Sequence, residues 1–185
     1  CMRYEIKNQL LTFYLENPKR TETYVRQSFA DTGLVEQQVI LLAESIVNKF
    51  RGQSMRTQQS VTSIFLRPLF AYFQTTNSSW PNNSTDWQLT ILGFFQFYLT
   101  DTDWSQSRVG YRMRKWQTTI GGLLEFLIEE EIIPRDVKVP RIELKKIQSL
   151  ANNQPLLGQP KTRVADIAIH PKTLLVDINF GANAS

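Results

Sequence analysis

The stretch Ser105–Pro134 (SQSRVGYRMRKWQTTIGGLLEFLIEEEIIP) carries the most regular hydrophobic pattern of the chain. Its large apolar residues recur at the period of an α-helix and form one narrow stripe: Val109, Met113, Trp116, Ile120, Leu123, Leu124 and Leu127. We therefore predict a helix over about 105–131 that buries this stripe in a helical bundle. Gly121-Gly122 interrupts the pattern, and we interpret the pair as a place where another helix packs closely. Pro134 prevents the helix from continuing, because proline has no backbone N–H to donate.

The beginning of this stretch is basic and contains no acidic residue. Arg108, Arg112 and Lys115 fall on one flank of the predicted helix, beside the apolar stripe, and Ser105 and Ser107 precede them. Arginine can pair with phosphate or guanine, and serine hydroxyls at a helix start can bind phosphate. The pattern predicts contacts with the major groove of DNA. A solvated helix face is the alternative, and the pattern leaves both open.

Three further helices are predicted from hydrophobic periodicity, over about 34–50, 57–74 and 86–100. Pro68 lies inside the second and is expected to kink it, since proline removes a backbone hydrogen bond. Thr85 and Gln88 have the spacing of a capping box at the start of the third.

The N-terminal part has a weaker pattern. Tyr4, Leu11 and Leu15 lie at roughly helical spacing and predict a short helix over about 2–15. Residues 19–30 show no clear period. We nevertheless expect an extra N-terminal helical region over 1–52, which includes the helix predicted over 34–50.

A second group of candidate DNA contacts lies at the start of the helix predicted over 57–74. Arg56, Thr57 and Gln58 form this group, with Arg51 before it and Arg67 one turn before the expected kink. Glutamine and threonine can contact base edges or phosphate. Polar residues are also common at any helix start, and that alternative stays open.

The composition of the chain excludes several classes of protein and of binding site. The 185 residues carry a formal net charge of +4 and 42% hydrophobic residues, which argues against wholesale disorder and permits a polyanionic partner. The single cysteine, Cys1, excludes a disulfide framework or a cysteine-based zinc site within the chain. No apolar run is long enough for a membrane span, so we expect no membrane partner.

No catalytic constellation is recognisable. His170 is the one histidine and has no Cys, Ser or Asp arrangement around it, so it is interpreted as structural. Glu129, Glu130 and Glu131 point to different faces of a helix and cannot converge on one metal ion. We expect no catalytic residue, no cofactor, no metal site and no small-molecule substrate.

The order of the predicted helices and three of their segments resemble the N-terminal core-binding (SAM-like) domain of tyrosine recombinases, the phage integrase family. That family's first helix ends in a pattern similar to Leu66, Leu69, Phe70 and Phe73, and its second in an aromatic run similar to Phe94–Leu99. Its last helix begins with Ser and basic residues and ends in an acidic-Ile-Ile-Pro exit, similar to Ser105–Pro134. The resemblance covers about 55–140.

The resemblance implies a mainly α fold with a small orthogonal four-helix bundle over 53–140. Residues 141–185 would then be a linker and the start of a truncated catalytic domain, with a short β-like tail over 164–180. It also implies sequence-specific binding of a double-stranded recombination half-site, self-association on DNA, and a cytoplasmic, nucleoid-associated bacterial or phage protein. Cleavage would belong to the later domain, so this chain alone would not be an enzyme. The alternative function is a non-catalytic helical domain that binds or regulates another protein.

Overall fold

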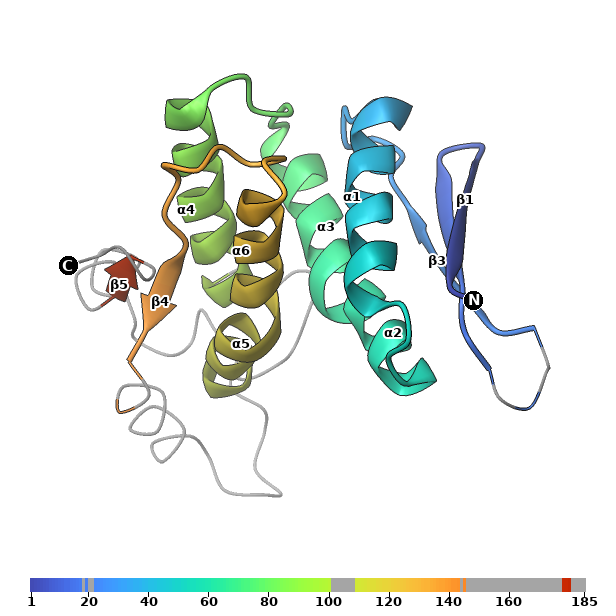
Figure 1. Cartoon of the computed structure of the whole chain (residues 1–185). Coiled ribbons are helices and arrows are strands. Elements are labelled where there is room, and N and C mark those ends of the chain that lie inside the picture. The colour runs from blue at the N-terminus through green and yellow to red at the C-terminus, as the bar shows by residue number, and fades with distance from the viewer. Residues whose placement is uncertain (18, 20–21, 101–108, 144, 146–177, 181–185) are drawn as a thin grey trace, which may run out of the picture. The chain divides into compact units, whose positions relative to one another are not determined.

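The computed structural model describes residues 1–17, 19, 22–100, 109–143, 145 and 178–180 (Figure 1). The described chain is mainly helical and includes a small three-stranded sheet. It forms two compact units, unit 1 over Cys1–Trp80 and unit 2 over Pro81–Ser185. The helices of Met55–Thr76 therefore share a unit with the sheet, whereas the domain predicted over 53–140 groups them with the later helices.

Unit 1 begins with an antiparallel sheet of β1 (Arg3–Lys7), β2 (Leu10–Tyr14) and β3 (Tyr24–Ser28), in the order β1-β2-β3. The prediction of a helix over 2–15 is wrong, and the N-terminal region predicted as helical over 1–52 contains this sheet before its helix, Glu36–Phe50. Asn8 and Gln9 join β1 to β2 with φ angles of 52° and 60°, the left-handed conformation of a two-residue hairpin turn. Leu11 and Phe13 face the core as alternate residues of a strand.

The helices of unit 1 are α1 (Glu36–Phe50), α2 (Met55–Val61), the π-helical turn η1 (Thr62–Leu66) and α3 (Arg67–Thr76). Helix α1 packs against β1, where the Tyr4 hydroxyl donates to Glu44 Oε1 at 3.0 Å, and η1 packs against β3. The core between sheet and helices consists of apolar side chains, which include Met2, Leu11, Phe13, Val39, Leu42, Ile46, Phe65 and Phe70.

The π-helical turn explains how the helix predicted over 57–74 accommodates Pro68. Proline cannot donate a backbone hydrogen bond, and its ring would collide with the carbonyl four residues earlier. Here the Arg67 N–H donates to the Thr62 carbonyl across the wider π turn, and Pro68 lies at the start of α3. The helical path from Met55 to Thr76 therefore continues through the proline.

Unit 2 contains α4 (Ser84–Thr100), α5 (Val109–Lys115), the π-helical turn η2 (Trp116–Ile120) and α6 (Gly121–Glu129). Strand β4 (Pro140–Ile142) pairs antiparallel with β5 (Ile178–Phe180), the described part of the predicted β-like tail. The apolar stripe is buried as predicted, and Trp116 packs against Phe95 with ring centroids 4.8 Å apart.

The start of α4 differs from the predicted capping box. The Asp86 N–H donates to the Asn83 side chain at 2.9 Å, so Asn83 caps the helix. Gln88 instead forms two hydrogen bonds with the backbone of Lys138, at 2.9 and 2.8 Å. Its amide thereby holds the chain after α6 against α4.

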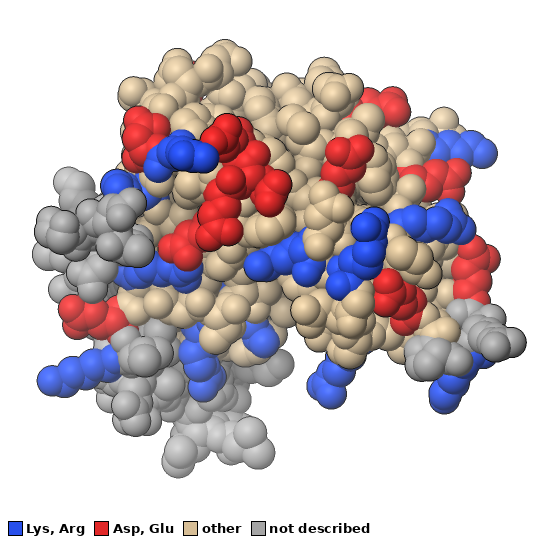
Figure 2. Space-filling view, viewed as in Figure 1, with Lys and Arg blue, Asp and Glu red and all other residues tan. Residues whose placement is uncertain are grey.

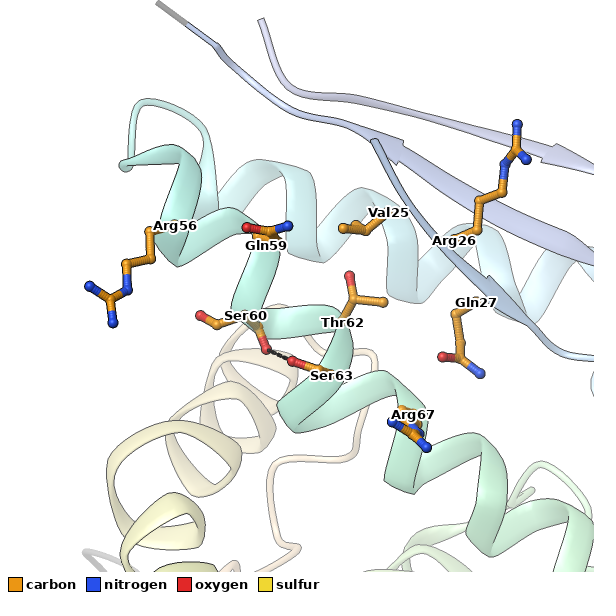
Figure 3. Close-up of a pocket in the computed structure, with 9 residues that line it drawn as sticks. All are labelled: Val25, Arg26, Gln27, Arg56, Gln59, Ser60, Thr62, Ser63 and Arg67. Carbon is orange, nitrogen blue, oxygen red and sulfur yellow. Dashed lines mark hydrogen bonds between the residues drawn. The ribbon is translucent and has the colours of Figure 1, made fainter. Parts of the chain in front are cut away.

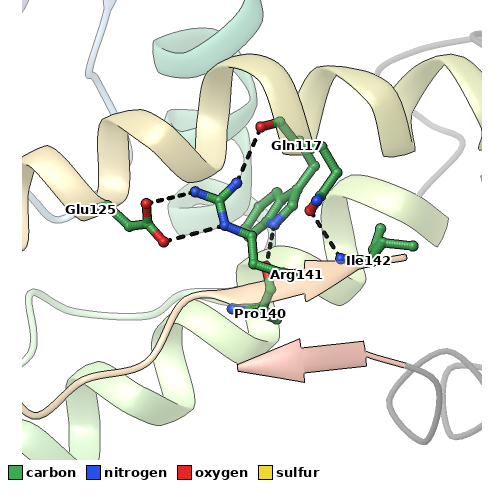
Figure 4. A network of polar contacts seen from close by, with 6 residues as sticks. Gln117, Glu125, Pro140, Arg141 and Ile142 are labelled. Atoms are coloured by element: carbon green, nitrogen blue, oxygen red, sulfur yellow. Dashed lines mark hydrogen bonds and ion pairs between the residues drawn. The ribbon is translucent and has the colours of Figure 1, made fainter. Parts of the chain in front are cut away.

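A polar network joins β4 to the helix that precedes it (Figure 4). Arg141 pairs with Glu125 at 2.8 Å and donates to the Gln117 carbonyl at 3.2 Å, while the Gln117 side chain accepts from the Ile142 N–H. A Cβ atom on Gly121 would lie 2.1 Å from Arg141 Nη1. Gly121 therefore makes room for a guanidinium group, and not for the second helix that the Gly pair predicted.

This geometry predicts opposite effects of alanine at the two adjacent glycines. Gly121→Ala should destabilise the protein by about 1–3 kcal/mol, because the methyl group displaces the Arg141 guanidinium from its partners. Gly122→Ala is the control: nothing lies within 4 Å of its Cβ position, and alanine favours helix by up to about 1 kcal/mol. Urea denaturation measures both, and equal shifts for the two variants would contradict the packing role of Gly121.

Candidate nucleic-acid interface

One member of the basic flank predicted on the helix of 105–131, Arg112, is buried. Arg112 has 1% of its surface exposed, and its Nη1 donates to the Tyr98 carbonyl at 2.9 Å. The prediction that Arg112 contacts DNA is therefore wrong, because the residue lies on the core side of α5, next to Met113. Burial raises the pKa of the Tyr98 phenol far above its ordinary value, and the Arg112 charge partly opposes this shift.

Of the other residues predicted on that flank, Lys115 is half-buried, and the rest lie outside the described residues. The ammonium group of Lys115 lies 5.4 Å from the centre of the exposed Tyr111 ring, a cation–π contact. Ser105, Ser107 and Arg108 lie outside the described residues, so their predicted contacts stay predictions.

Gln58, predicted as a DNA contact, is also a core residue. It has 0% of its surface exposed, and its amide oxygen accepts from the Glu16 N–H at 3.0 Å while its amide nitrogen donates to the Phe50 carbonyl at 3.0 Å. Gln58 thus ties the end of β2 to the end of α1, and the prediction of a DNA contact is wrong. The hydroxyl of its neighbour Thr57 is engaged with Ser54, the N-cap of α2, at 2.9 Å.

Arg56 belongs to a groove in unit 1, which we call the arginine groove (Figure 3). The groove has a volume of about 540 Å³ and runs between the edge strand β3 and the segment α2–η1–α3. Its walls are Val25, Arg26 and Gln27 on the strand side and Arg56, Gln59, Ser60, Thr62, Ser63 and Arg67 on the helix side.

Helical spacing explains why the helix side of the groove is polar. Arg56, Ser60, Ser63 and Arg67 follow one another at intervals of three or four residues, which places them on one face. Val61, Phe65, Leu66 and Leu69 lie on the opposite, buried side. One amphipathic segment therefore supplies both the core of unit 1 and the polar wall of the groove.

The arginine groove carries three positive charges and no acidic lining residue. Arg26, Arg56 and Arg67 are exposed, and none of them forms an ion pair with any residue that the structure describes. The Arg26 guanidinium lies 4.5 Å from the centre of the Tyr24 ring, which orients it without neutralising its charge. In Figure 3 the three arginines lie at separate places around the groove: Arg56 and Arg67 lie on the helix side with Ser60 and Ser63 between them, and the Arg26 side chain points away from the helix side.

Three other arginines of the described chain form ion pairs, whereas Arg51 and Arg114 are exposed and, like the groove arginines, have no ion pair with a described residue. Arg3, Arg135 and Arg141 pair with Glu22, Glu131 and Glu125, respectively. On the face shown in Figure 2, Lys and Arg side chains lie in separate groups among acidic ones. The arginine groove is thus distinguished by three arginines without ion pairs to described residues that line one concave polar surface.

The sequence indicated only part of this site. Arg56 was predicted, and Arg67 was noted in the same basic group, whereas Arg26 and Gln27 were missed. They lie on β3, in the segment where no period was recognised, and an alternating pattern over Tyr24–Ser28 was the available signal. No group of three or more potential metal ligands occurs among the described residues. Within the same residues, no helix has the length and apolar character needed to cross a membrane.

Comparisons with known proteins give no relative for this chain. Neither the protein-family models, nor the curated proteins, nor the solved structures contain a match. The function is therefore inferred from the charged and hydrogen-bonding groups of the described residues.

Two neighbouring glutamines test the assignment of core and groove. Gln58→Ala should destabilise the protein by about 1–3 kcal/mol, because it leaves the Glu16 N–H and the Phe50 carbonyl without this partner. Gln59→Ala, at an exposed groove position, should change stability by less than about 0.5 kcal/mol. Denaturant titrations of both variants provide the measurement, and a tolerant Gln58 site would refute its core role.

Proposed function

We propose that this chain binds double-stranded DNA as the N-terminal part of a site-specific tyrosine recombinase, and that the arginine groove forms part of the interface. The supporting observation is the combination of three exposed arginines without ion pairs to described residues and the uncharged hydrogen-bonding groups that line the same groove. Arginine, serine and glutamine are the side chains that commonly bind the DNA backbone.

The spread of the arginines favours an extended polyanion over a small anion. Three guanidinium groups that converged on one point would suit a single phosphate. Here they lie at separate places around an open groove, so a chain of successive phosphates matches them better (Figure 3). DNA presents such a chain, and neutralising it releases counterions, which favours binding at low salt.

The resemblance of Ser105–Pro134 and the two preceding helical segments to the SAM-like core-binding domain supports the recombinase part of the proposal. On this view the chain supplies part of a clamp around a recombination half-site and self-associates on DNA. Strand cleavage and rejoining belong to a separate catalytic domain, so the chain alone binds duplex without cutting it.

The salt dependence of duplex binding tests the role of the groove. Changing Arg26, Arg56 and Arg67 together to alanine should weaken binding and reduce the slope of log K against log salt by about 0.9 for each phosphate that the variant no longer neutralises. Fluorescence anisotropy with labelled duplex at several salt concentrations measures this. Arg135→Ala is the matched control, because Glu131 already pairs with that charge.

Two outcomes would contradict the proposal in different ways. An unchanged slope in the triple variant would remove the arginine groove from the interface. Failure of the unaltered chain to bind any duplex at low salt would refute DNA binding and favour a helical domain that binds another protein.

A further inference from the structure

Thr62 is the one groove residue that combines burial with an unsatisfied polar group in the described contacts. The side chain lines the groove, yet only 6% of its surface is exposed, and its hydroxyl has no hydrogen-bond partner among the described residues. A buried hydroxyl without a partner destabilises a folded protein, and most such groups are satisfied. A ligand that accepts a hydrogen bond from this hydroxyl would explain why it is there.

The π turn places Thr62 on the same side of the helix as Arg67. Thr62 begins η1, and its carbonyl accepts the hydrogen bond from the Arg67 N–H that closes the π turn. Residues joined across one helical turn lie on the same side of a helix, so Thr62 and Arg67 both contribute to the groove. Turns of the π type often occur at functional sites.

We propose that Thr62 is a phosphate-binding residue: its hydroxyl donates a hydrogen bond to a phosphodiester oxygen of a DNA strand bound in the arginine groove. The inference rests on the proposed function. The hydroxyl is enclosed in the structure, so the contact requires rotation about the Cα–Cβ bond, which moves the hydroxyl to another staggered position. Threonine in a helix has two accessible rotamers, and Figure 3 shows the side chain extending from η1 towards β3.

This assignment gives the arginines and Thr62 different roles in binding. The arginines supply charge and therefore set the salt dependence of binding. Thr62 supplies an uncharged donor to the backbone, which contributes affinity without neutralising a phosphate and without reading a base. The contribution of Thr62 should therefore be equal for all duplex sequences.

Thr62→Val tests the proposal, because valine keeps the branched shape and removes the hydroxyl. We expect duplex affinity to fall on the order of tenfold, the effect of one hydrogen bond to a charged group, with an unchanged salt slope and the same loss on several unrelated duplexes. The melting temperature should rise by a few degrees, because the unsatisfied hydroxyl is gone. Thr62→Ser should restore affinity towards that of the unaltered chain.

Thr118→Val is the matched control. Thr118 also lies in a π turn, but it is exposed and its hydroxyl bonds to the Arg114 carbonyl at 2.8 Å, so duplex affinity should not change. If Thr62→Val binds duplex as tightly as the unaltered chain, or loses affinity on one sequence only, the proposal is overturned. The proposed function fails separately, when the unaltered chain itself does not bind duplex.

Discussion

The amphipathic division of Met55–Thr76 is the constraint on which unit 1 depends. Val61, Phe65 and Leu66 of this segment fill the core beneath the sheet, which fixes the rotation of the helix about its axis. Because that rotation is fixed, Arg56 and Arg67 must lie on the opposite side, in the arginine groove beside β3. The buried face thus determines where the charged face is presented.

Two features keep this segment in its position. Gln58 connects α2 to the end of β2 and to the last turn of α1, which anchors the N-terminal end of the segment. The π turn η1 accepts Pro68 without ending the helix, so Arg67 remains part of the same polar face as Arg56. In unit 2 a comparable π turn, η2, lies beside the Arg141 network, and there it serves packing, since Arg141 is paired with Glu125.

Helical periodicity in the sequence was sufficient to predict the helices but not the sheet. The stripe from Val109 to Leu127 is long and regular, and its burial was predicted correctly. The first hairpin was misread because β2 places apolar residues on both faces, with Leu10 exposed and Leu11 buried, which imitates a helical spacing. The alternation of Tyr4 and Ile6 before the turn at Asn8 was the better guide.

The candidate site shows a different limit of sequence analysis. Position on a helix face distinguishes Arg56 from Gln58, but Arg112 lies beside the apolar stripe, where a small rotation decides between core and solvent. Its aliphatic stem and its hydrogen bond to the Tyr98 carbonyl make burial possible, and that carbonyl is 14 residues away in the sequence. Arg26 reaches the groove only through the pairing of β3 with β2, which depends on contacts distant along the chain.

Amide hydrogen exchange, measured with and without duplex DNA at low salt, tests the central claim most directly. We predict that added duplex slows exchange in Tyr24–Ser28 and in Met55–Arg67, the two walls of the arginine groove. Protection confined to Val109–Lys115, with both walls unchanged, would contradict it.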